Sequence, residues 1–261
     1  MVDPPQLLVE PIVATLVHDT DYFGNVVHHF ALQEAHKRLS VTAVSEVDVV
    51  PYEAPAMALT DPWETVQELI SRPKNAEALS AYELTFESPH VRCNDEATEY
   101  ARESFKPGRP LLEAAFELTR RIYEEFEYKP GSTTVATPVR EVMKKRRGVC
   151  QDFAHLQIAM LRGLGLSARY VSGYIYNQAP EGKPPALVGA DASHAWLSVY
   201  CPRFGFIDLD PTNGLIPRDE HVTLAWGRDF SDTSPLKGVI LGGGEHVVKV
   251  GVDVSRIDRR A

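Results

Sequence analysis

The residue with the clearest chemical potential is Cys150, which lies in the segment RRGVCQDFAH, residues 146–155. The apolar spacing that follows it predicts a helix beginning at this cysteine. Backbone N–H groups are free at a helix start and the helix dipole favours an anion there, so a thiolate at Cys150 would be stabilised. A thiolate beside a base is a nucleophile. Without a base, the same cysteine is a small buried residue.

Two histidines are candidates for that base. His155 lies five residues further along the same helix, about 140° around it and roughly 7.5 Å along it, so it points away from the sulfur. His194 begins an expected strand in GADASHAWLSVY, directly after a loop, where its side chain can reach a helix end. We therefore choose His194, with simple packing at a strand end as the alternative. Trp196 shares its strand face and is expected to shield the imidazole or contact substrate, as well as to fill the core.

A third group must orient the imidazole, and the segment FIDLDPTNG offers Asp208 and Asp210. Residues two apart on a strand face the same way, so periodicity does not choose between these carboxylates. Asp210 stands at the strand end before a proline, and we favour it as the orienting residue. Asp208 is then expected to be a structural carboxylate or a solvated edge residue.

No metal site or cofactor is expected from the sequence. The segment HDTDYFGN, residues 18–25, begins like a calcium loop, but Phe23 and Phe30 stand where oxygen ligands are required. The adjacent His28 and His29 have no second pair at zinc-ligand spacing.

The elements that must position these residues follow from hydrophobic periodicity and from helix-capping residues. Residues 178–189 are expected to form a loop, and residues 61–84 give no clear signal. Helices are predicted from Pro110 to about residue 126, from Pro138 to about residue 148, and over residues 150–164. Strands are predicted over residues 39–49, 168–176, 194–200, 204–209 and 246–254.

These elements predict an α+β fold with three parts. Residues 1–88 form a β-rich N-terminal domain, residues 89–225 a mixed catalytic core, and residues 226–261 a short C-terminal β segment.

The composition restricts the class of protein. The chain has 261 residues, of which 44% are hydrophobic and 24% charged, and its net charge is −9. This acidic balance gives no sign of nucleic-acid binding. No apolar run approaches the roughly 20 residues of a membrane span, and the start lacks the features of a signal peptide. The chain has three cysteines, Cys93, Cys150 and Cys201, and such a small, odd number does not indicate a disulfide framework. A reducing cytoplasm is therefore the expected compartment.

Several segments resemble one known family, the bacterial transglutaminase-like superfamily. The core motifs are GVCQDFAH, LRGLGLSARYVSGY, DASHAWLSVY and DLDPTNG, and the segments DYFGNVVHHFALQEAHKRLSVTAVSEV and GRDFSDTSPLKGVILGGGEH are similar to its flanking regions. The resemblance implies a papain-like core with a catalytic triad of Cys150, His194 and Asp210. Relatives usually carry one or two further strands at the start, so the N-terminal sheet is expected to lack its first strands.

The expected activity is acyl transfer through a thioester on Cys150, with cleavage of an amide or peptide bond in a peptide or protein substrate. Members of the family include cross-linking transferases, peptidases and amidases, so transfer to an amine by a protein-glutamine transglutaminase is one alternative. A non-catalytic peptide-binding module that keeps the fold is another. The resemblance also implies action with an ATP-grasp-type ligase, whereas the oligomeric state stays open.

Overall fold

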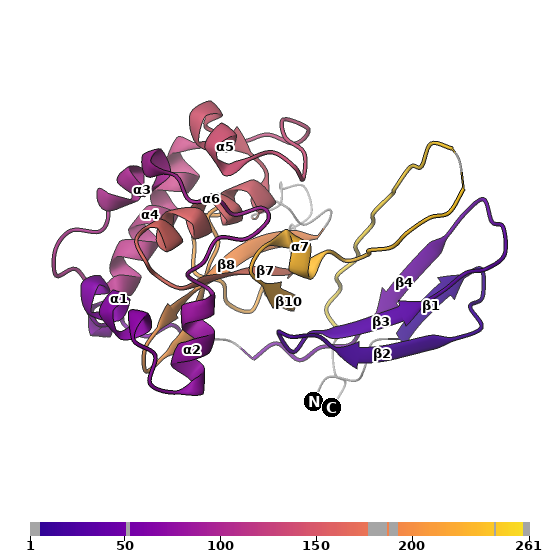
Figure 1. The fold of residues 1–261 in the computed structure, drawn as a ribbon, viewed down its shortest axis with the longest axis horizontal. Helices are drawn as coiled ribbons and strands as arrows, with labels where there is room; N and C mark the ends of the chain where they lie inside the picture. Colours follow the sequence, from indigo (N-terminus) through magenta and orange to yellow (C-terminus); the bar gives the residue numbers. More distant parts are fainter. Residues whose placement is uncertain (1–5, 51–52, 177–186, 188–192, 243, 258–261) are drawn as a thin grey trace. The chain divides into compact units, whose positions relative to one another are not determined.

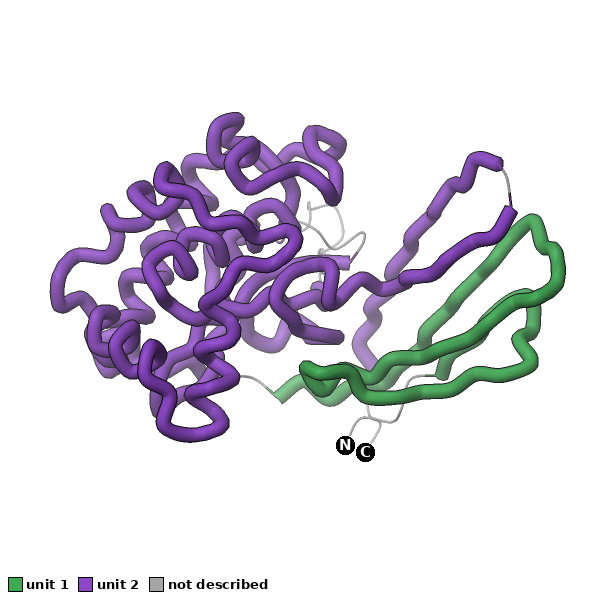
Figure 2. Tube along the Cα trace, in the orientation of Figure 1, with its two compact units in different colours: residues 1–51 green, residues 52–261 purple. Residues whose placement is uncertain are grey.

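The computed structural model describes residues 6–50, 53–176, 187, 193–242 and 244–257. The chain forms two compact units, residues 1–51 and residues 52–261 (Figure 2). The boundary near residue 51 differs from the one expected near residue 88. The reason is that the intervening segment is helical and belongs to the second unit.

Unit 1 consists of two antiparallel strand pairs. Strand β1 (Gln6–Glu10) pairs with β4 (Ser40–Val44), and β2 (Leu16–Thr20) pairs with β3 (Val26–Phe30). The turn between β2 and β3 is stabilised by the Asp21 carboxylate, which accepts the backbone N–H groups of residues 23 and 25. The strand predicted over residues 39–49 is shorter, because its partner β1 provides only five residues for pairing.

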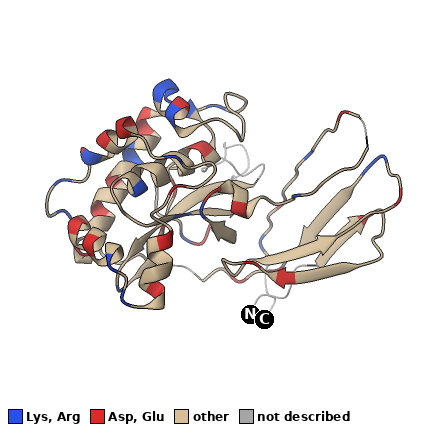
Figure 3. Cartoon of the chain, in the orientation of Figure 1, with Lys and Arg blue, Asp and Glu red and all other residues tan. Residues whose placement is uncertain are grey.

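Unit 2 begins with helices that sequence periodicity left unassigned. The helix over Trp63–Ser71 buries Val66 and Ile70, which lie one helical turn apart. The next helix, Ala76–Glu83, is capped by the Asn75 side chain, which accepts the N–H of Ala78. The helices before the central one are η1 (Met57–Leu59), α1 (Trp63–Ser71), α2 (Ala76–Glu83), α3 (Asp95–Arg102), α4 (Leu111–Glu125) and α5 (Val139–Lys145) (Figure 1). Charged residues of both signs are interspersed along these helices (Figure 3).

The central helix α6 (Cys150–Gly163) begins at the predicted residue. Its apolar residues are buried, and the helix packs against α3, α5, β7 and β8. Gly165 follows the C-cap residue Leu164, and its positive φ of 73° forms the left-handed turn that glycine favours after a helix. A short parallel pair, β5 (Glu127–Tyr128) and β6 (Arg147–Gly148), lies immediately before the start of α6.

A four-stranded antiparallel sheet carries the remaining candidate residues. Its strand order is β10–β7–β8–β9, with β7 (Ala168–Ile175), β8 (His194–Cys201), β9 (Gly205–Leu209) and β10 (His221–Gly227). The strands β7, β8 and β9 agree with prediction to within about a residue. Strand β10 was not predicted, and it extends the sheet beyond the expected core boundary at residue 225. It is followed by α7 (Phe230–Thr233).

The predicted C-terminal strand is not formed. Residues 244–257 contain no strand, and the apolar side chains Val247, Val248 and Val250 are exposed. Alternation of apolar residues predicts a strand only where a neighbouring backbone completes its hydrogen bonds. Within the described residues, this tail has no such neighbour.

Two further expectations concern loops and membranes. Nearly all of the loop expected over residues 178–189 lies outside the described residues. Among the helices that are described, none is both long and apolar enough to cross a membrane.

Candidate active site

Cys150 is the first residue of α6 and is partly exposed. The turn before it is fixed by Asp152, whose Oδ2 accepts the Val149 N–H at 2.8 Å and the Thr133 hydroxyl at 2.6 Å. Burial raises the pKa of Asp152, although these hydrogen bonds oppose the shift. A side chain at Gly148 would place its Cβ 2.8 Å from the Asp152 Cβ, so glycine is required there. The helix start therefore presents the sulfur in a defined place.

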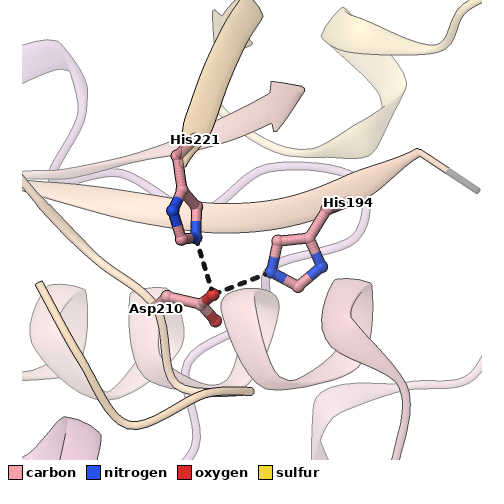
Figure 4. Close-up of side chains that lie close together, drawn as sticks. All are labelled: His194, Asp210 and His221. Carbon is pink, nitrogen blue, oxygen red and sulfur yellow. Dashed lines mark hydrogen bonds and ion pairs between the residues drawn. The ribbon is translucent and has the colours of Figure 1, made fainter. Parts of the chain in front are cut away.

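His194, the first residue of β8, is buried against the Asp210 carboxylate. Its Nε2 donates to Asp210 Oδ2 at 2.9 Å, which is the contact predicted for Asp210 rather than Asp208 (Figure 4). Burial of the ring lowers the pKa of His194, but the Asp210 carboxylate raises it more strongly, to about 10. The imidazole is therefore held in its charged form around neutral pH.

Cys150 interacts with this imidazole. Its thiolate also raises the pKa of His194, so the two groups are close. The Nδ1 atom of His194 makes no hydrogen bond of ordinary length to any described residue. The structure thus brings together the three side chains named from sequence. One ring nitrogen of His194 bonds to Asp210, and the other makes no hydrogen bond of ordinary length within the described part of the chain.

Asp210 follows β9 and is completely buried. Its Oδ1 accepts the backbone N–H groups of Thr212 and Asn213, while its Oδ2 accepts His194, His221 and the Asn213 side chain. Burial alone would raise the pKa of Asp210, but the two histidines lower it far below its usual range. The carboxylate therefore keeps its negative charge despite its burial.

His221 was missed by the sequence analysis. It begins β10 and its Nε2 donates to Asp210 Oδ2 at 3.0 Å (Figure 4). The available signal was a histidine at the start of an alternating segment, HVTLAWG, which is the same signal that identified His194. That segment was not recognised as a strand, and its pairing with β7 is not encoded locally.

Trp196 is buried beside the two imidazoles, which fits the expected shielding role. Its ring is stacked with His194 at 5.9 Å between centroids and meets His221 edge-on at 5.1 Å. The indole N–H donates to Asp208 at 3.0 Å, and Asp208 also accepts the Ser198 hydroxyl. Of the two alternatives expected for Asp208, these contacts favour the structural carboxylate, and its partners include the tryptophan.

His155 packs away from the site, as its helical position predicted. Its Nε2 accepts the backbone N–H of Phe230 at 3.1 Å, and its ring is stacked on His90. Burial lowers the pKa of His155 to about 3, so the ring is neutral at physiological pH.

His194, Asp210 and His221 form a set that could hold a metal ion, since one ligand atom of each lies within 4.8 Å of the others. The hydrogen bonding fits a metal poorly. A metal-bound imidazole usually donates its other N–H to an acceptor, but Nδ1 of both histidines lacks a partner among the described residues. Both Nε2 atoms and the carboxylate instead satisfy one another directly.

Comparison with known proteins places this geometry in a family. Residues 98–211 match the family model of the transglutaminase-like superfamily, and residues 3–48 match the bacterial transglutaminase-like N-terminal region. An uncharacterized protein of Mycobacterium tuberculosis is 40% identical over 260 residues, covering 95% of this chain and 80% of that protein. The chain belongs to the transglutaminase-like superfamily. An uncharacterized protein of Mycobacterium leprae is 32% identical over 95% of this chain and 85% of its own length.

Two further relatives show the range of this transglutaminase-like superfamily, which includes cysteine proteases and transglutaminases. A structure described as a putative cysteine protease from Cytophaga hutchinsonii has a TM-score of 0.66 and 24% identity, covering 90% of this chain and 73% of that one. It shares the α+β fold. The protein-glutamine gamma-glutamyltransferase of Pseudomonas aeruginosa is 30% identical over 111 residues, which are 42% of this chain and 17% of that protein.

Proposed function

We propose that this transglutaminase-like protein is a cysteine-dependent acyl-transfer enzyme that cleaves an amide or peptide bond. The observation that carries the proposal is the His194–Asp210 hydrogen bond beside a cysteine that begins a buried helix. A buried carboxylate that orients an imidazole next to a nucleophile is the arrangement that acyl-transfer enzymes use.

In the proposed mechanism, the proton of Cys150 resides on His194, so a thiolate faces an imidazolium, and the sulfur of the thiolate attacks the substrate carbonyl carbon. When the tetrahedral intermediate collapses, the C–N bond breaks and His194 returns its proton to the leaving amine. A thioester on Cys150 remains. Water then attacks the thioester, with His194 as its base, and the acid product and the free thiol are regenerated. Asp210 keeps the proton-carrying Nε2 of the ring directed away from the sulfur.

The negative charge on the intermediate needs hydrogen-bond donors. The first amides of a helix have no acceptor within the helix, so the Cys150 N–H is the donor we propose. The neighbouring Val149 N–H is excluded from this role because it already donates to Asp152.

Transfer to an amine, rather than to water, is the second candidate reaction. The Pseudomonas aeruginosa relative named protein-glutamine gamma-glutamyltransferase favours it, over the region that the two chains share. Both reactions use the same thioester, so they differ only in the acceptor.

Mass spectrometry of peptide libraries, incubated with the protein in the presence and absence of a primary amine, tests the proposal. Loss of a fragment indicates peptide cleavage, deamidation indicates amide hydrolysis, and incorporation of the amine indicates transglutamination. Cys150→Ala should abolish whichever reaction is seen, because it removes the attacking sulfur. Cys93→Ser is the matched control and should retain the activity.

A binding module that keeps the fold would bind library peptides without altering them. Equal turnover by the unaltered protein and by Cys150→Ala would also contradict the proposed chemistry. The two remaining expectations, action with an ATP-grasp-type ligase and a reducing cytoplasmic compartment, stay part of this proposal. The second is supported by the three free cysteines, Cys93, Cys150 and Cys201.

A further inference from the structure

The sheet register places a second histidine beside the proposed active site. His194 lies opposite Gly173 on one side of β7, and His221 lies opposite Ile175 on the other side. Gly173 has no side chain, and a Cβ there would lie 2.4 Å from the Trp196 ring and 2.2 Å from the Val222 carbonyl oxygen. This close packing brings both histidine-bearing strands to the same end of β7.

The two imidazoles converge on one oxygen atom. Nε2 of His194 and Nε2 of His221 both lie within hydrogen-bond distance of Asp210 Oδ2, at 2.9 and 3.0 Å. Both side chains are at most 1% exposed. An ionised carboxylate can only accept hydrogen bonds, so both Nε2 atoms must carry a proton. The hydrogen bond therefore assigns a proton on Nε2 to His221.

We propose that His221 is a positioning residue for the reaction proposed above: it fixes the Asp210 carboxylate and limits how strongly that carboxylate holds the proton of His194. This inference rests on the proposed function, because it assigns His221 a task in the same proton transfer.

His194 and His221 share the negative charge of one oxygen atom of Asp210. A carboxylate oxygen that receives a second donor is less basic toward the first. The hydrogen bond from His221 stabilises the Asp210 anion, which agrees with its lowering of the Asp210 pKa. His194 must release its proton to the leaving amine, so a carboxylate that held the imidazolium too tightly would slow that step.

Among the described residues, few other titratable or charged groups bear on His194. Cys150 faces it from α6 and Asp210 from the end of β9, while β7 contributes only Gly173 at the paired position. Asp208 lies on β9, where its hydrogen bonds go to Trp196 and Ser198. His221 also lies directly beside His194, with 5.9 Å between the ring centroids, so its effect on the titration of His194 combines the shared hydrogen bond to Asp210 with this direct contact.

The test uses substitutions in the full chain. His221→Phe keeps a ring of similar size but removes the N–H donor. His221→Gln returns an amide N–H near the position of Nε2. Thr223→Ala, at an exposed position on the same strand, is the matched control. Two readouts are followed: the pH titration of the His194 ring by ¹⁵N NMR, and the rate at which iodoacetamide alkylates Cys150.

The proposal predicts that His221→Phe raises the titration midpoint of His194 by roughly 0.5 to 1 pH unit, the equivalent of about one hydrogen bond. Alkylation of Cys150 should slow by about 3- to 10-fold as the imidazole loses its fixed orientation. His221→Gln should restore both values, and Thr223→Ala should change neither. A merely structural role would lower the melting temperature of His221→Phe without moving the midpoint.

An unchanged midpoint and rate in a folded His221→Phe protein would overturn the proposal, as would a His221→Gln protein that behaves like His221→Phe. If His221→Phe does not fold, the unaltered protein still provides a test. Its spectrum must show the His221 proton on Nε2, and a proton on Nδ1 alone would overturn the proposal. Neither readout needs a substrate, so failure of the proposed peptide or amide chemistry would be seen separately in the Cys150→Ala comparison.

Discussion

At the residue scale, Asp210 combines complete burial with a retained negative charge. Five donors from His194, His221, Thr212 and Asn213 satisfy its two oxygens. A buried carboxylate can remain ionised when its oxygens accept this many hydrogen bonds. Its charge in turn holds the pKa of His194 above the ordinary value of about 6.5.

Asp210→Asn should therefore act on both the rate and its pH dependence. Loss of the oriented tautomer lowers kcat by up to about 10⁴-fold in triads of this kind. Without the carboxylate, only Cys150 opposes the effect of burial, so the pKa of His194 should fall and the alkaline limb of the activity profile should move to lower pH. The pH dependence of kcat/KM on a peptide found in the library screen measures this. If the alkaline limb of kcat/KM stays at the same pH in Asp210→Asn, Asp210 does not control the pKa of His194.

Asp208→Asn is the matched comparison, because it removes the second carboxylate of the same segment. Asp208 accepts the Trp196 indole and the Ser198 hydroxyl, so the change should cost about 1–3 kcal/mol of unfolding free energy. It should lower kcat far less than Asp210→Asn. Urea unfolding and the same kinetic assay check this, and a larger kinetic effect than that of Asp210→Asn would reverse the assignment.

The sequence identified Cys150, His194 and Asp210 through residue type and position at the ends of elements. Periodicity could not choose between Asp208 and Asp210, since residues two apart on an expected strand face the same way. His221 could not be connected with them because its contact depends on β10 pairing with β7 across an intervening stretch of chain. Long-range pairing of this kind leaves no local pattern.

At the element scale, the close approach between β7, β10 and Trp196 depends on Gly173. In Gly173→Ala, the new Cβ would lie 2.2 Å from a backbone oxygen and 2.4 Å from the Trp196 ring, so strand or ring must shift. We expect a loss of about 1–3 kcal/mol in stability, as in other overpacked cores, and a fall in activity as His194 and His221 move.

Thermal unfolding and alkylation of Cys150 together measure this effect. Gly238→Ala is the control, because nothing lies within 4 Å of its would-be Cβ and its φ is not positive. If Gly173→Ala resembled Gly238→Ala in both measurements, the packing described for Trp196 would be wrong.

Elements with a strong apolar signal were predictable. Helix α6 and strands β7, β8 and β9 are buried on most sides, so their apolar residues form long patterns. Helices α1 and α2 were left unassigned because their buried positions are few, Val66 and Ile70 in the first and Ala81 in the second. The C-terminal tail had the pattern of a strand but lacks a paired neighbour in the described part of the chain.

At the scale of the whole molecule, His155 should make the stability depend on pH. Its folded pKa of about 3 lies below the unfolded value of about 6.5, so the unfolded state binds a proton first as the pH falls. The unfolding free energy should therefore decrease between pH 6.5 and pH 5, with a slope of up to about 1.4 kcal/mol per pH unit. His194 has the opposite shift, so its contribution is complete below pH 6.5 and is lost as the pH rises toward about 10.

Urea unfolding between pH 5 and pH 8 measures this slope, in a range above the titration of ordinary carboxylates. His155→Gln removes the titrating group, so the unfolding free energy should depend less on pH between pH 5 and pH 6.5. The loss of packing should lower the unfolding free energy at every pH. An equally steep slope in His155→Gln would show that another group is responsible.

Competitive alkylation measures whether His194 activates Cys150 as a nucleophile. The protein is treated with limiting iodoacetamide near neutral pH, and the modified Cys93 and Cys150 peptides are quantified by mass spectrometry. Cys93 is the internal control, because burial raises its pKa and no histidine orients it in the proposed mechanism. We expect Cys150 to react at least about tenfold faster than Cys93, and His194→Ala to remove this difference. Equal reactivity of the two cysteines in the unaltered protein would contradict the activation of Cys150 by His194.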